Sequence, residues 1–339
     1  EVGAHFGGYL PFEVDLTENL IRGGENVLAV WADNSDDPTY PPGKAQSRLD
    51  FAYFGGIYRD VWLVATNRVY VTNPNEAGEV AGGGIFLHVD TACEKEASVR
   101  TMVHIRNDDE KTRKIKARVR ILDPEGKEVV ATGTDLKVKA GRSSNIDVSL
   151  AIKDPQLWSP LSPWLYRIEV ILKDSEGKPV DGVAVKTGLR TIDFRGKQGF
   201  FLNNKPYPGK LIGANRHQDH AYVGNALPNN GQWRDALLLK RGGCDIIRAA
   251  HYPAEPAFMD ACDALGLFYI ESTPGWQFWN DTLPLFEERV YSDIRHMVRR
   301  NRNYAAMIMW EPILNETSYP SYFAKRTHEI VHEEYPYSG

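Results

Sequence analysis

The chain has 339 residues, of which 42% are apolar and 25% charged, with a formal net charge of −5. This composition suffices for two or three globular domains and excludes wholesale disorder. Because the balance is acidic and the longest basic run is Arg299-Arg300-Asn301-Arg302, we expect no nucleic-acid partner. No apolar stretch approaches the roughly 18 residues of a membrane span, and three scattered cysteines exclude a disulfide framework.

The first 71 residues have the pattern of an all-β segment. Short β-branched and aromatic runs at 27–31 and 61–64 are bounded by turn residues and predict two strands. A Pro/Gly-rich stretch at 36–43 lies between them. Its length is typical of a functional or partner-covering loop, although an ordinary surface loop fits equally well.

Residues 72–190 continue the β pattern in a more regular form. Apolar and polar residues alternate in the runs 84–89, 97–103 and 115–122, and turn signals occur at 123–126 and 174–177. About seven such strands in this length predict an immunoglobulin-like sandwich. The region contains no paired acids or metal-ligand cluster, so we expect it to act as a spacer.

From residue 191 onward, predicted strands alternate with predicted helices. The strands are 210–214, 245–249, 268–270 and 307–310, and the helices lie at 232–241, 256–265, in the 280s and 290s, and around 322–335. The third helix carries an apolar stripe formed by Phe286, Val290, Ile294, Met297 and Val298. This alternation is typical of βαβ units and predicts a parallel sheet.

Polar side chains follow each of these four predicted strands. In chain order they are Asn215, Arg216, His217 and His220, then Arg248 and His251, then Glu271 and Trp276, and last Glu311, Asn315 and Glu316. In a barrel of βα units, catalytic groups gather where the strands end. A single histidine after a strand is more often structural, but four such sets in succession favour an active-site face.

A metal site built from these histidines and glutamates is the alternative to consider. His217 and His220 are three residues apart, which is not the spacing that places two imidazoles on one face of a helix. Barrel hydrolases that bind a metal at the first strand use ligands two residues apart. We therefore expect no catalytic metal and no cofactor.

The pair Asn315-Glu316 indicates acid–base chemistry. A glutamate that acts as a general acid needs a pKa raised by burial or by a second carboxylate. An amide beside it can hydrogen-bond a substrate hydroxyl, and a second carboxylate roughly 5 Å away would make a retaining glycosidase. The alternative is that Glu316 caps the following helix or forms a surface ion pair.

Several motifs together resemble glycoside hydrolase family 2, the family of β-galactosidases, β-glucuronidases and β-mannosidases. The resemblance covers essentially the whole chain. It rests on residues 54–61 (FGGIYRDV), 155–160 (PQLWSP) with Leu165-Tyr166, 201–206 (FLNNKP), 213–217 (GANRH), 247–253 (IRAAHYP) and Asn315-Glu316.

This resemblance implies a multidomain fold. Residues 1–71 would be the C-terminal part of a jelly-roll sugar-binding-like domain, and residues 72–190 an immunoglobulin-like β-sandwich. Residues 191–339 would be the N-terminal half of a catalytic (β/α)8 TIM barrel. Family members begin before this jelly-roll segment and carry their nucleophilic glutamate after a later strand, so we expect a chain truncated at both ends that is inactive alone.

The resemblance also implies roles for individual residues. Glu316 would be the catalytic acid/base and Asn315 would contact the sugar 2-hydroxyl. The remaining substrate-binding candidates are His217, His251, Arg216, Asp50, Trp276 and Trp279. The form Asn215-Arg216-His217 resembles β-galactosidases more than the other branches, and Asp50 resembles an acid that reaches the galactosidase pocket from the jelly roll.

Two departures from the family pattern affect these expectations. Trp310 and Asn315 are one residue further apart than is usual in the family, so Glu311 remains a second candidate for the acid. The stretch Gly275-Trp276-Gln277 replaces a Glu-x-His that binds Mg²⁺ in some galactosidases. We therefore expect no Mg²⁺ requirement and instead an aromatic wall of Trp276, Phe278 and Trp279 for stacking a sugar.

The sequence thus predicts a retaining exo-β-glycosidase, with a β-galactosidase first and a β-glucuronidase or β-mannosidase second. A uronic acid would need a cation, and Arg216 or Arg248 could supply it. A non-catalytic carbohydrate-binding protein is the alternative of another class, with a metal hydrolase third. The expected partner is an oligosaccharide or galactoside substrate. The sequence is compatible with a homo-oligomer. A periplasmic, secreted or cytoplasmic location fits equally well.

Overall fold

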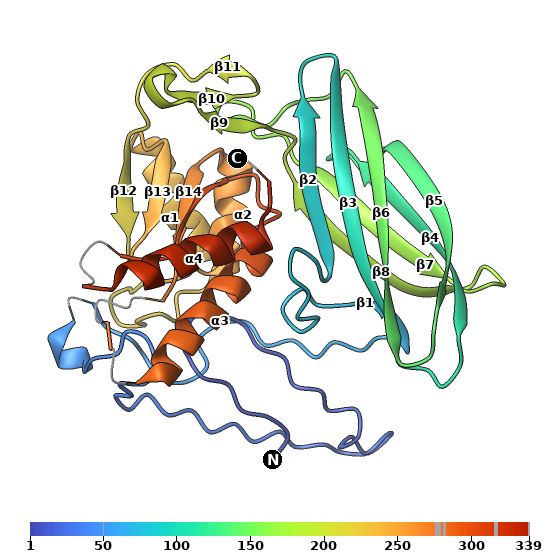
Figure 1. The fold of residues 1–339 in the computed structure, drawn as a ribbon, viewed down its shortest axis with the longest axis horizontal. Helices are drawn as coiled ribbons and strands as arrows, with labels where there is room; N and C mark the ends of the chain where they lie inside the picture. Colours follow the sequence, from blue (N-terminus) through green and yellow to red (C-terminus); the bar gives the residue numbers. More distant parts are fainter. Residues whose placement is uncertain (50, 275–278, 281–282, 315–317, 338–339) are drawn as a thin grey trace.

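The fold was analysed in a computed structural model, which describes residues 1–49, 51–274, 279–280, 283–314 and 318–337. A β-sandwich forms one side of the molecule, and a parallel sheet with its helices forms the other (Figure 1). Within the described residues, no helix is both long and apolar enough to cross a membrane.

The sandwich consists of two antiparallel sheets with a common core. One sheet joins β1 (Val69–Val71), β3 (Glu96–Asn107) and β2 (Ile85–Ala92) in that order, with β6 (Arg142–Lys153) also paired to β3. The other has the order β5 (Glu128–Val138), β4 (Arg113–Leu122), β7 (Tyr166–Lys173) and β8 (Pro179–Thr187). Alternate residues of both sheets, such as Val103, Val119 and Val170, are fully buried in one core. The predicted strands and turns of this region are confirmed.

The two strands predicted in the first 71 residues, at 27–31 and 61–64, were wrong. In the described residues before β1, the only regular element is the short 3-10 helix Gln46–Arg48. Trp31 and Trp62 are 91% and 78% exposed. A strand is stabilised by hydrogen bonds to a neighbouring strand, and no described segment pairs with these two runs. The runs 27–31 and 61–64 therefore have the composition of strands, but no neighbouring strand among the described residues pairs with them.

The remaining residues form a small antiparallel sheet and then the parallel sheet. The small sheet comprises β9 (Ile192–Phe194), β10 (Phe200–Leu202) and β11 (Lys205–Pro206). The parallel sheet has the order β12 (Gly213–Arg216), β13 (Ile246–Ala249), β14 (Phe268–Ser272) and β15 (Met307–Glu311). Its four strands confirm the prediction, although β12 begins three residues later than expected.

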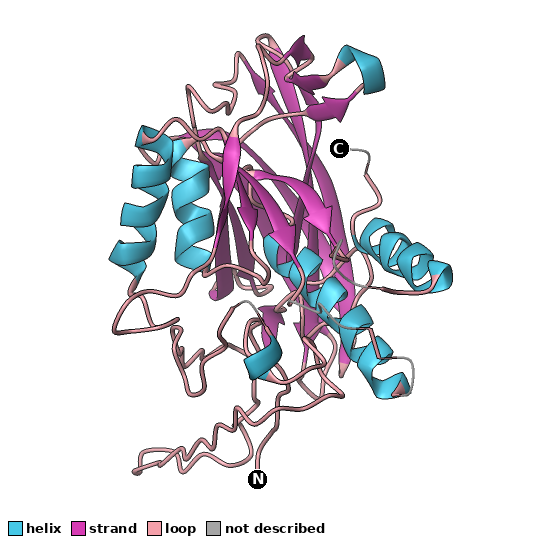
Figure 2. Ribbon diagram, turned by 90° about the vertical axis from the view of Figure 1, so that its left-hand side faces the viewer, coloured by secondary structure: helices cyan, strands magenta, loops and turns pink. Residues whose placement is uncertain are grey.

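A helix follows each strand of the parallel sheet. These helices are α1 (Asn229–Arg241), α2 (Pro256–Leu265), α3 (Pro284–Asn301) and α4 (Ser321–Glu334). α2 begins with Pro256 and ends at Gly266, whose left-handed φ of 71° is accessible to glycine at little cost. The predicted apolar stripe of α3 is buried, and the helices pack in two pairs, α1 with α2 and α3 with α4 (Figure 2).

Several hydrogen bonds attach the sandwich to the α/β part, among them those of Asn303 and Trp158. Asn303, which precedes β15, accepts a hydrogen bond from the backbone N–H of Leu87 (3.0 Å) and donates one to the carbonyl of Ile85 (2.8 Å), and thus pairs with β2. The fully buried Trp158 donates from Nε1 to the carbonyl of Asp263 on α2 (2.9 Å). In each contact a side chain of one part thus bonds the backbone of the other part.

The Pro-rich loop at 36–43 lies against α3 through Tyr40. The Tyr40 hydroxyl donates to Oδ1 of Asp293 (2.7 Å), whereas Oδ2 of Asp293 is buried without a hydrogen-bond partner. Arg289 reaches the same loop, 3.3 Å from Asp37. Burial raises the pKa of Asp293 to about 7, although the Tyr40 hydrogen bond acts in the opposite direction. The loop thus covers α3 rather than projecting into solvent.

We predict that Asp293 makes the protein less stable as the pH rises. An acid with a raised folded-state pKa stabilises the fold fully below its unfolded value of 3.8, and this contribution is lost as the pH rises through about 7. Between pH 5 and pH 8 the loss should be roughly 2 kcal/mol. Asp293→Asn keeps the acceptor for Tyr40 but cannot ionise, so its free energy of unfolding should fall less over this range.

Urea unfolding at the two pH values measures this difference, with Asp147→Asn on the exposed surface of β6 as the matched control. The control should follow the wild type. Equal pH dependence in wild type and Asp293→Asn would show that Asp293 does not titrate in this way.

Candidate functional site

The carboxyl ends of the four parallel strands bring together side chains from distant parts of the sequence. Parallel register aligns Asn215 of β12 with Arg248 of β13, and Ser272 of β14 with Glu311 of β15. His217 and His251 follow β12 and β13 directly. One edge of the sheet therefore carries two imidazoles, a guanidinium and a carboxylate, as the strand-end pattern predicts.

An ion pair crosses this edge from β13 to β15. Arg248 donates from Nη2 (2.6 Å) and Nε (3.1 Å) to Oε1 of Glu311. The hydroxyl of Ser272 donates to Oε2 of Glu311. Both carboxylate oxygens thus accept hydrogen bonds, one from the guanidinium of Arg248 and the other from the hydroxyl of Ser272. This arrangement makes Glu311 a poor candidate for the acid and gives it a positioning role.

The two histidines form an edge-to-face pair. Their ring centroids are 5.6 Å apart with planes at 86°. Arg248 Nη1 lies 3.5 Å from His251 Nδ1 and 3.4 Å from Asn215 Oδ1. His251 is buried, whereas the side chain of His217 is 38% exposed. The pair thus offers polar ring nitrogens at a surface that a small ligand can reach.

Residues from the N-terminal segment complete this part of the site. Phe51 is buried, and its ring centroid lies 6.2 Å from both His217 and His251. Tyr9 stacks on Tyr252 at 4.5 Å. The hydroxyl of Tyr252 lies 3.4 Å from Nδ1 of His217. The histidines therefore pack against an aromatic cluster. Tyr9 and Phe51 of the N-terminal segment and Tyr252 after β13 form this cluster.

Arg59 ties this cluster to the parallel sheet. It pairs with the buried Glu255 (2.7 Å) and donates to Gln218 (3.1 Å) and to the carbonyl of Pro253 (2.8 Å). Burial raises the pKa of Glu255, and the positive charge of Arg59 opposes that rise. The chain after each histidine is thereby fixed to the N-terminal segment.

Glu271 lies at the end of β14 but is completely buried. Burial raises its pKa to about 7, and the neighbouring Arg300 counteracts the rise. One of its oxygens accepts from Asn301 of α3. The carboxyl therefore faces the helix layer and joins β14 to α3.

Two predicted substrate-binding residues do not join the histidines. Arg216 pairs with Asp235 of α1 (2.7 Å), and its guanidinium lies over the ring of Phe258 of α2 at 4.0 Å. The alternation along β12 turns this side chain outward, because Asn215 points to the opposite face. The structure thus places Arg216 in the helix layer, apart from His217 and His251, and its substrate contact stays a prediction.

Trp279 was expected to form part of a sugar-stacking wall. Its ring instead packs on Phe323 of α4, with centroids 4.3 Å apart, and contacts Phe286 of α3 at 6.3 Å. This environment is the core between two helices, and the role of Trp279 in stacking a sugar stays a prediction. Asp50, Trp276, Asn315 and Glu316 lie outside the described residues, and their predicted roles stay predictions.

Sequence reasoning missed three contributors, namely Phe51, Arg59 and Ser272. Phe51 and Arg59 come from a segment predicted to be a separate domain, and the signals there were Asp50 beside Phe51 and the motif at 54–61 that contains Arg59. Ser272 follows Glu271 at the end of a predicted strand, and alternation along β14 could have identified it. Among the described residues, no group of three or more His, Cys, Asp or Glu side chains is arranged to hold a metal ion.

We predict that Arg248 and Glu311 are strongly coupled. Arg248→Met should lower the free energy of unfolding by about 2 kcal/mol, because it leaves a largely buried carboxylate without its cation. Glu311→Gln should also destabilise, and the double variant should lose clearly less than the sum of the two. A double-mutant cycle in urea measures this coupling. Additive losses would contradict a direct ion pair at this edge.

Comparison with known proteins shows which family the chain matches. Residues 84–190 match the family described as Glycosyl hydrolases family 2, and residues 193–332 match Glycosyl hydrolases family 2, TIM barrel domain. A β-galactosidase of Thermoanaerobacter pseudethanolicus is 33% identical over 334 residues, which are 98% of this chain and 42% of that protein. A putative β-glucuronidase of Formosa agariphila is 31% identical, with 91% and 35% covered.

Solved structures give the same result. β-Glucuronidase 2 of Bacteroides uniformis, covalently bound to cyclophellitol-6-carboxylate aziridine, matches with a TM-score of 0.83 and 28% identity, covering 96% of this chain and 40% of that one. A glycosyl hydrolase family 2 member from Bacteroides cellulosilyticus matches with a TM-score of 0.84 and 27% identity, covering 100% and 43%. The chain spans less than half the length of these relatives, and it belongs to glycoside hydrolase family 2.

Proposed function

We propose that this chain is part of a retaining exo-β-glycosidase that removes terminal β-galactosyl units from oligosaccharides or other galactosides. The observation that carries the proposal is the sequence position of Asn315-Glu316, four residues after the end of β15. That strand ends at the edge that also holds His217, His251 and Arg248. The names of the relatives support a β-glycosidase of either galactosidase or glucuronidase type.

In the proposed mechanism, Glu316 is the general acid and base. It protonates the glycosidic oxygen as the bond to the anomeric carbon breaks, and a second carboxylate about 5 Å away forms the glycosyl–enzyme bond. Glu316 then removes a proton from the water that releases the sugar. Asn315 hydrogen-bonds the sugar 2-hydroxyl, and the ring nitrogens of His217 and His251 bind other hydroxyl groups.

Glu311 takes no part in proton transfer in this mechanism. Its two oxygens are occupied by Arg248 and Ser272. The ion pair holds the end of β15 in place, and the segment with Asn315 and Glu316 begins a few residues later. Glu311 thus contributes to placing the acid, because a displacement of about 1 Å at a catalytic group can lower the rate by about 10²-fold.

The charges at the site favour a neutral sugar over a uronic acid. A glucuronide carboxylate requires a cation, and the sequence offered Arg216 and Arg248 for this purpose. Arg216 is paired with Asp235 in the helix layer, and Arg248 is paired with Glu311. Within the described part of the site, both cations are thus already neutralised. A β-glucuronidase remains the second candidate because relatives carry that name.

We predict that the full-length protein cleaves aryl β-galactosides faster than the glucuronide, mannoside and glucoside. Glu316→Gln should lower kcat/KM for a galactoside with a poor leaving group by at least ~10²-fold, because the departing oxygen is no longer protonated. The loss should be much smaller with a dinitrophenyl leaving group, which departs without a proton. Glu311→Gln is the matched control, since it makes the same change five residues away.

Glu311→Gln should lower kcat/KM by the same factor for the galactoside with the poor leaving group and for the dinitrophenyl galactoside. This is expected if the substitution displaces the acid without removing it. A loss that depends on the leaving group in Glu311→Gln, with Glu316→Gln fully active, would reverse the two assignments. Faster turnover of the glucuronide would establish the second candidate. If no glycoside is cleaved while sugars still bind, the protein is a carbohydrate-binding member of the fold.

A further inference from the structure

A cluster of four lysines lies on the outward face of the sandwich sheet β5-β4-β7-β8. It consists of Lys114 and Lys116 on β4, Lys137 on β5 and Lys173 on β7, and we call it the lysine platform. All four are exposed, whereas the intervening Ile115 is buried in the core. The four amines therefore share one face, because paired residues of an antiparallel sheet point to the same side.

The register places like charges directly opposite each other. Lys114 is paired with Lys137, and Lys116 with Lys173. Like charges at directly opposite positions destabilise a sheet. A single acid, Asp135, stands opposite Lys116 on the other side. The lysine platform therefore works against folding stability, which calls for a reason outside the sandwich itself.

At the other end of the same face, the positive side chains form ion pairs with carboxylates. There Arg118 lies 2.6 Å from Glu128, and Arg120 lies 2.6 Å from Glu169. In contrast, no carboxylate of a described residue lies within ion-pair distance of any of the four platform amines. The positive charge of the platform is thus left to solvent or to an external anion.

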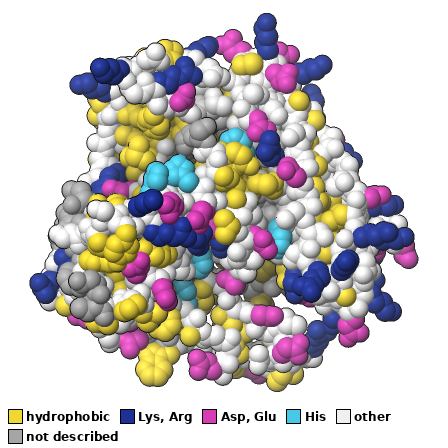
Figure 3. All heavy atoms as spheres, viewed as in Figure 1, with side chains coloured by type: hydrophobic (Ala, Val, Ile, Leu, Met, Phe, Trp, Pro, Cys, Tyr) yellow, Lys and Arg dark blue, Asp and Glu magenta, His cyan; other side chains and the backbone are white. Residues whose placement is uncertain are grey.

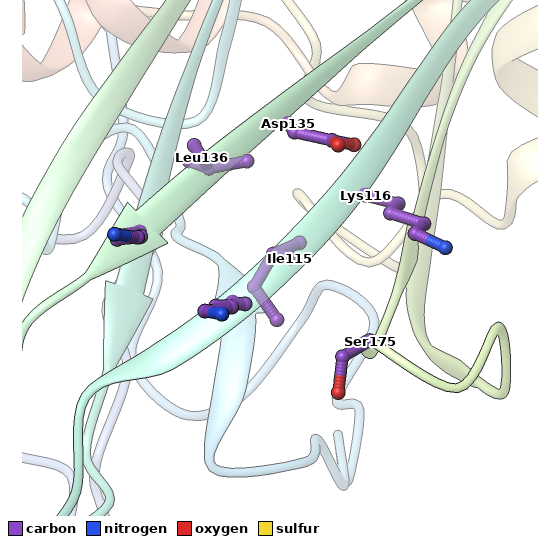
Figure 4. Close-up of a pocket in the computed structure, with 7 residues that line it drawn as sticks. Ile115, Lys116, Asp135, Leu136 and Ser175 are labelled. Carbon is purple, nitrogen blue, oxygen red and sulfur yellow. The ribbon is translucent and has the colours of Figure 1, made fainter.

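A shallow cavity of about 290 Å³ opens among these residues. Its lining consists of three platform lysines, an acid, a serine from the turn after β7 and two apolar residues: Lys114, Lys116, Lys137, Asp135, Ser175, Ile115 and Leu136. Figure 4 shows Lys116 and Asp135 on neighbouring strands and Ser175 on that turn. The face therefore offers a hollow with amine and hydroxyl donors and not only a flat charged surface.

The lysine platform lies away from the candidate site. β2, in the opposite sheet, contacts the α/β part through Asn303, and the sheet with β4, β5 and β7 lies beyond it in Figure 1. Figure 3 shows Lys and Arg side chains gathered along that outer side of the sandwich, with some acids among them. A long ligand can occupy this face without blocking the edge of β12–β15.

We propose that the lysine platform binds an acidic polysaccharide, a glycan chain with carboxylate or sulfate groups on successive sugars. Neighbouring lysines lie about 7 Å apart along β4 and about 5 Å apart across strands, so such a chain contacts several amines at once. The choice of a glycan among polyanions rests on the proposed function. A glycosidase gains from holding a polymer, because binding at a second site raises the effective concentration of chain ends.

The test uses the full-length protein in affinity electrophoresis through gels containing polygalacturonate, a sulfated galactan or a neutral galactan. The platform variant carries Lys→Gln at 114, 116, 137 and 173. Its matched control carries Lys→Gln at the exposed positions 95, 153, 197 and 210, so that the net charge changes equally. Turnover of a small aryl β-galactoside is measured on every protein, and a single-stranded oligonucleotide serves as a competing polyanion.

The acidic glycans should retard the wild type and the control, with binding about ten-fold weaker in the platform variant and in high salt. Small-substrate turnover should be unchanged. Equal retardation of both variants by the acidic glycans, or an equal weakening of neutral-galactan binding in the platform variant, would overturn the proposal. Preferential binding of the oligonucleotide would overturn the choice of glycan. Glycan binding by a protein without turnover would sink the proposed function and leave the platform standing.

Discussion

The Arg248–Glu311 ion pair is the interaction on which the candidate site depends. It joins β13 to β15 at the carboxyl ends of the sheet, and Ser272 adds β14 through the second carboxylate oxygen. Arg248 also reaches toward Asn215 and His251. Side chains from all four strands are thereby fixed relative to one another at the edge where the chemistry is proposed.

The surroundings of this edge explain how a mixed set of polar groups is held in place. Beneath the histidines, Phe51, Tyr9 and Tyr252 form an aromatic cluster to which the N-terminal segment contributes. Behind the strands, buried carboxyls face the helices, as Glu271 does toward α3. Groups that face the helix layer thus have structural partners there, and the histidines lie at the carboxyl edge of the sheet.

The sequence predicted the parts of this fold that depend on local pattern. The stripe from Phe286 to Val298 identified α3 and its buried face, and the proline and glycine around 256–266 gave the bounds of α2. The runs at 27–31 and 61–64 have the same β-type composition but form no strands. A strand needs a partner, and composition alone does not reveal whether that partner is present.

The site was predictable to the extent that strand ends determine it. His217, His251, Arg248 and Glu311 were identified because parallel strands align their carboxyl ends. The order of residues did not show that Arg216 lies in the helix layer, because this depends on which face of β12 the residue occupies. Nor did it show that Trp279 packs between α3 and α4, because an aromatic residue suits a helix core as well as a sugar. The lysine platform could not be predicted from the sequence, because its lysines become neighbours only through the pairing of β4 with β5 and β7.

The most direct test of this account is a crystal structure of the full-length protein with a galactose-configured inhibitor bound. The account predicts a sugar ring in contact with His217 and His251, with the Glu316 carboxyl at hydrogen-bond distance from the glycosidic oxygen. Glu311 should remain paired with Arg248. A structure in which Glu311 has left Arg248 to bind the glycosidic oxygen, or in which the sugar lies away from the edge of β12–β15, would contradict it.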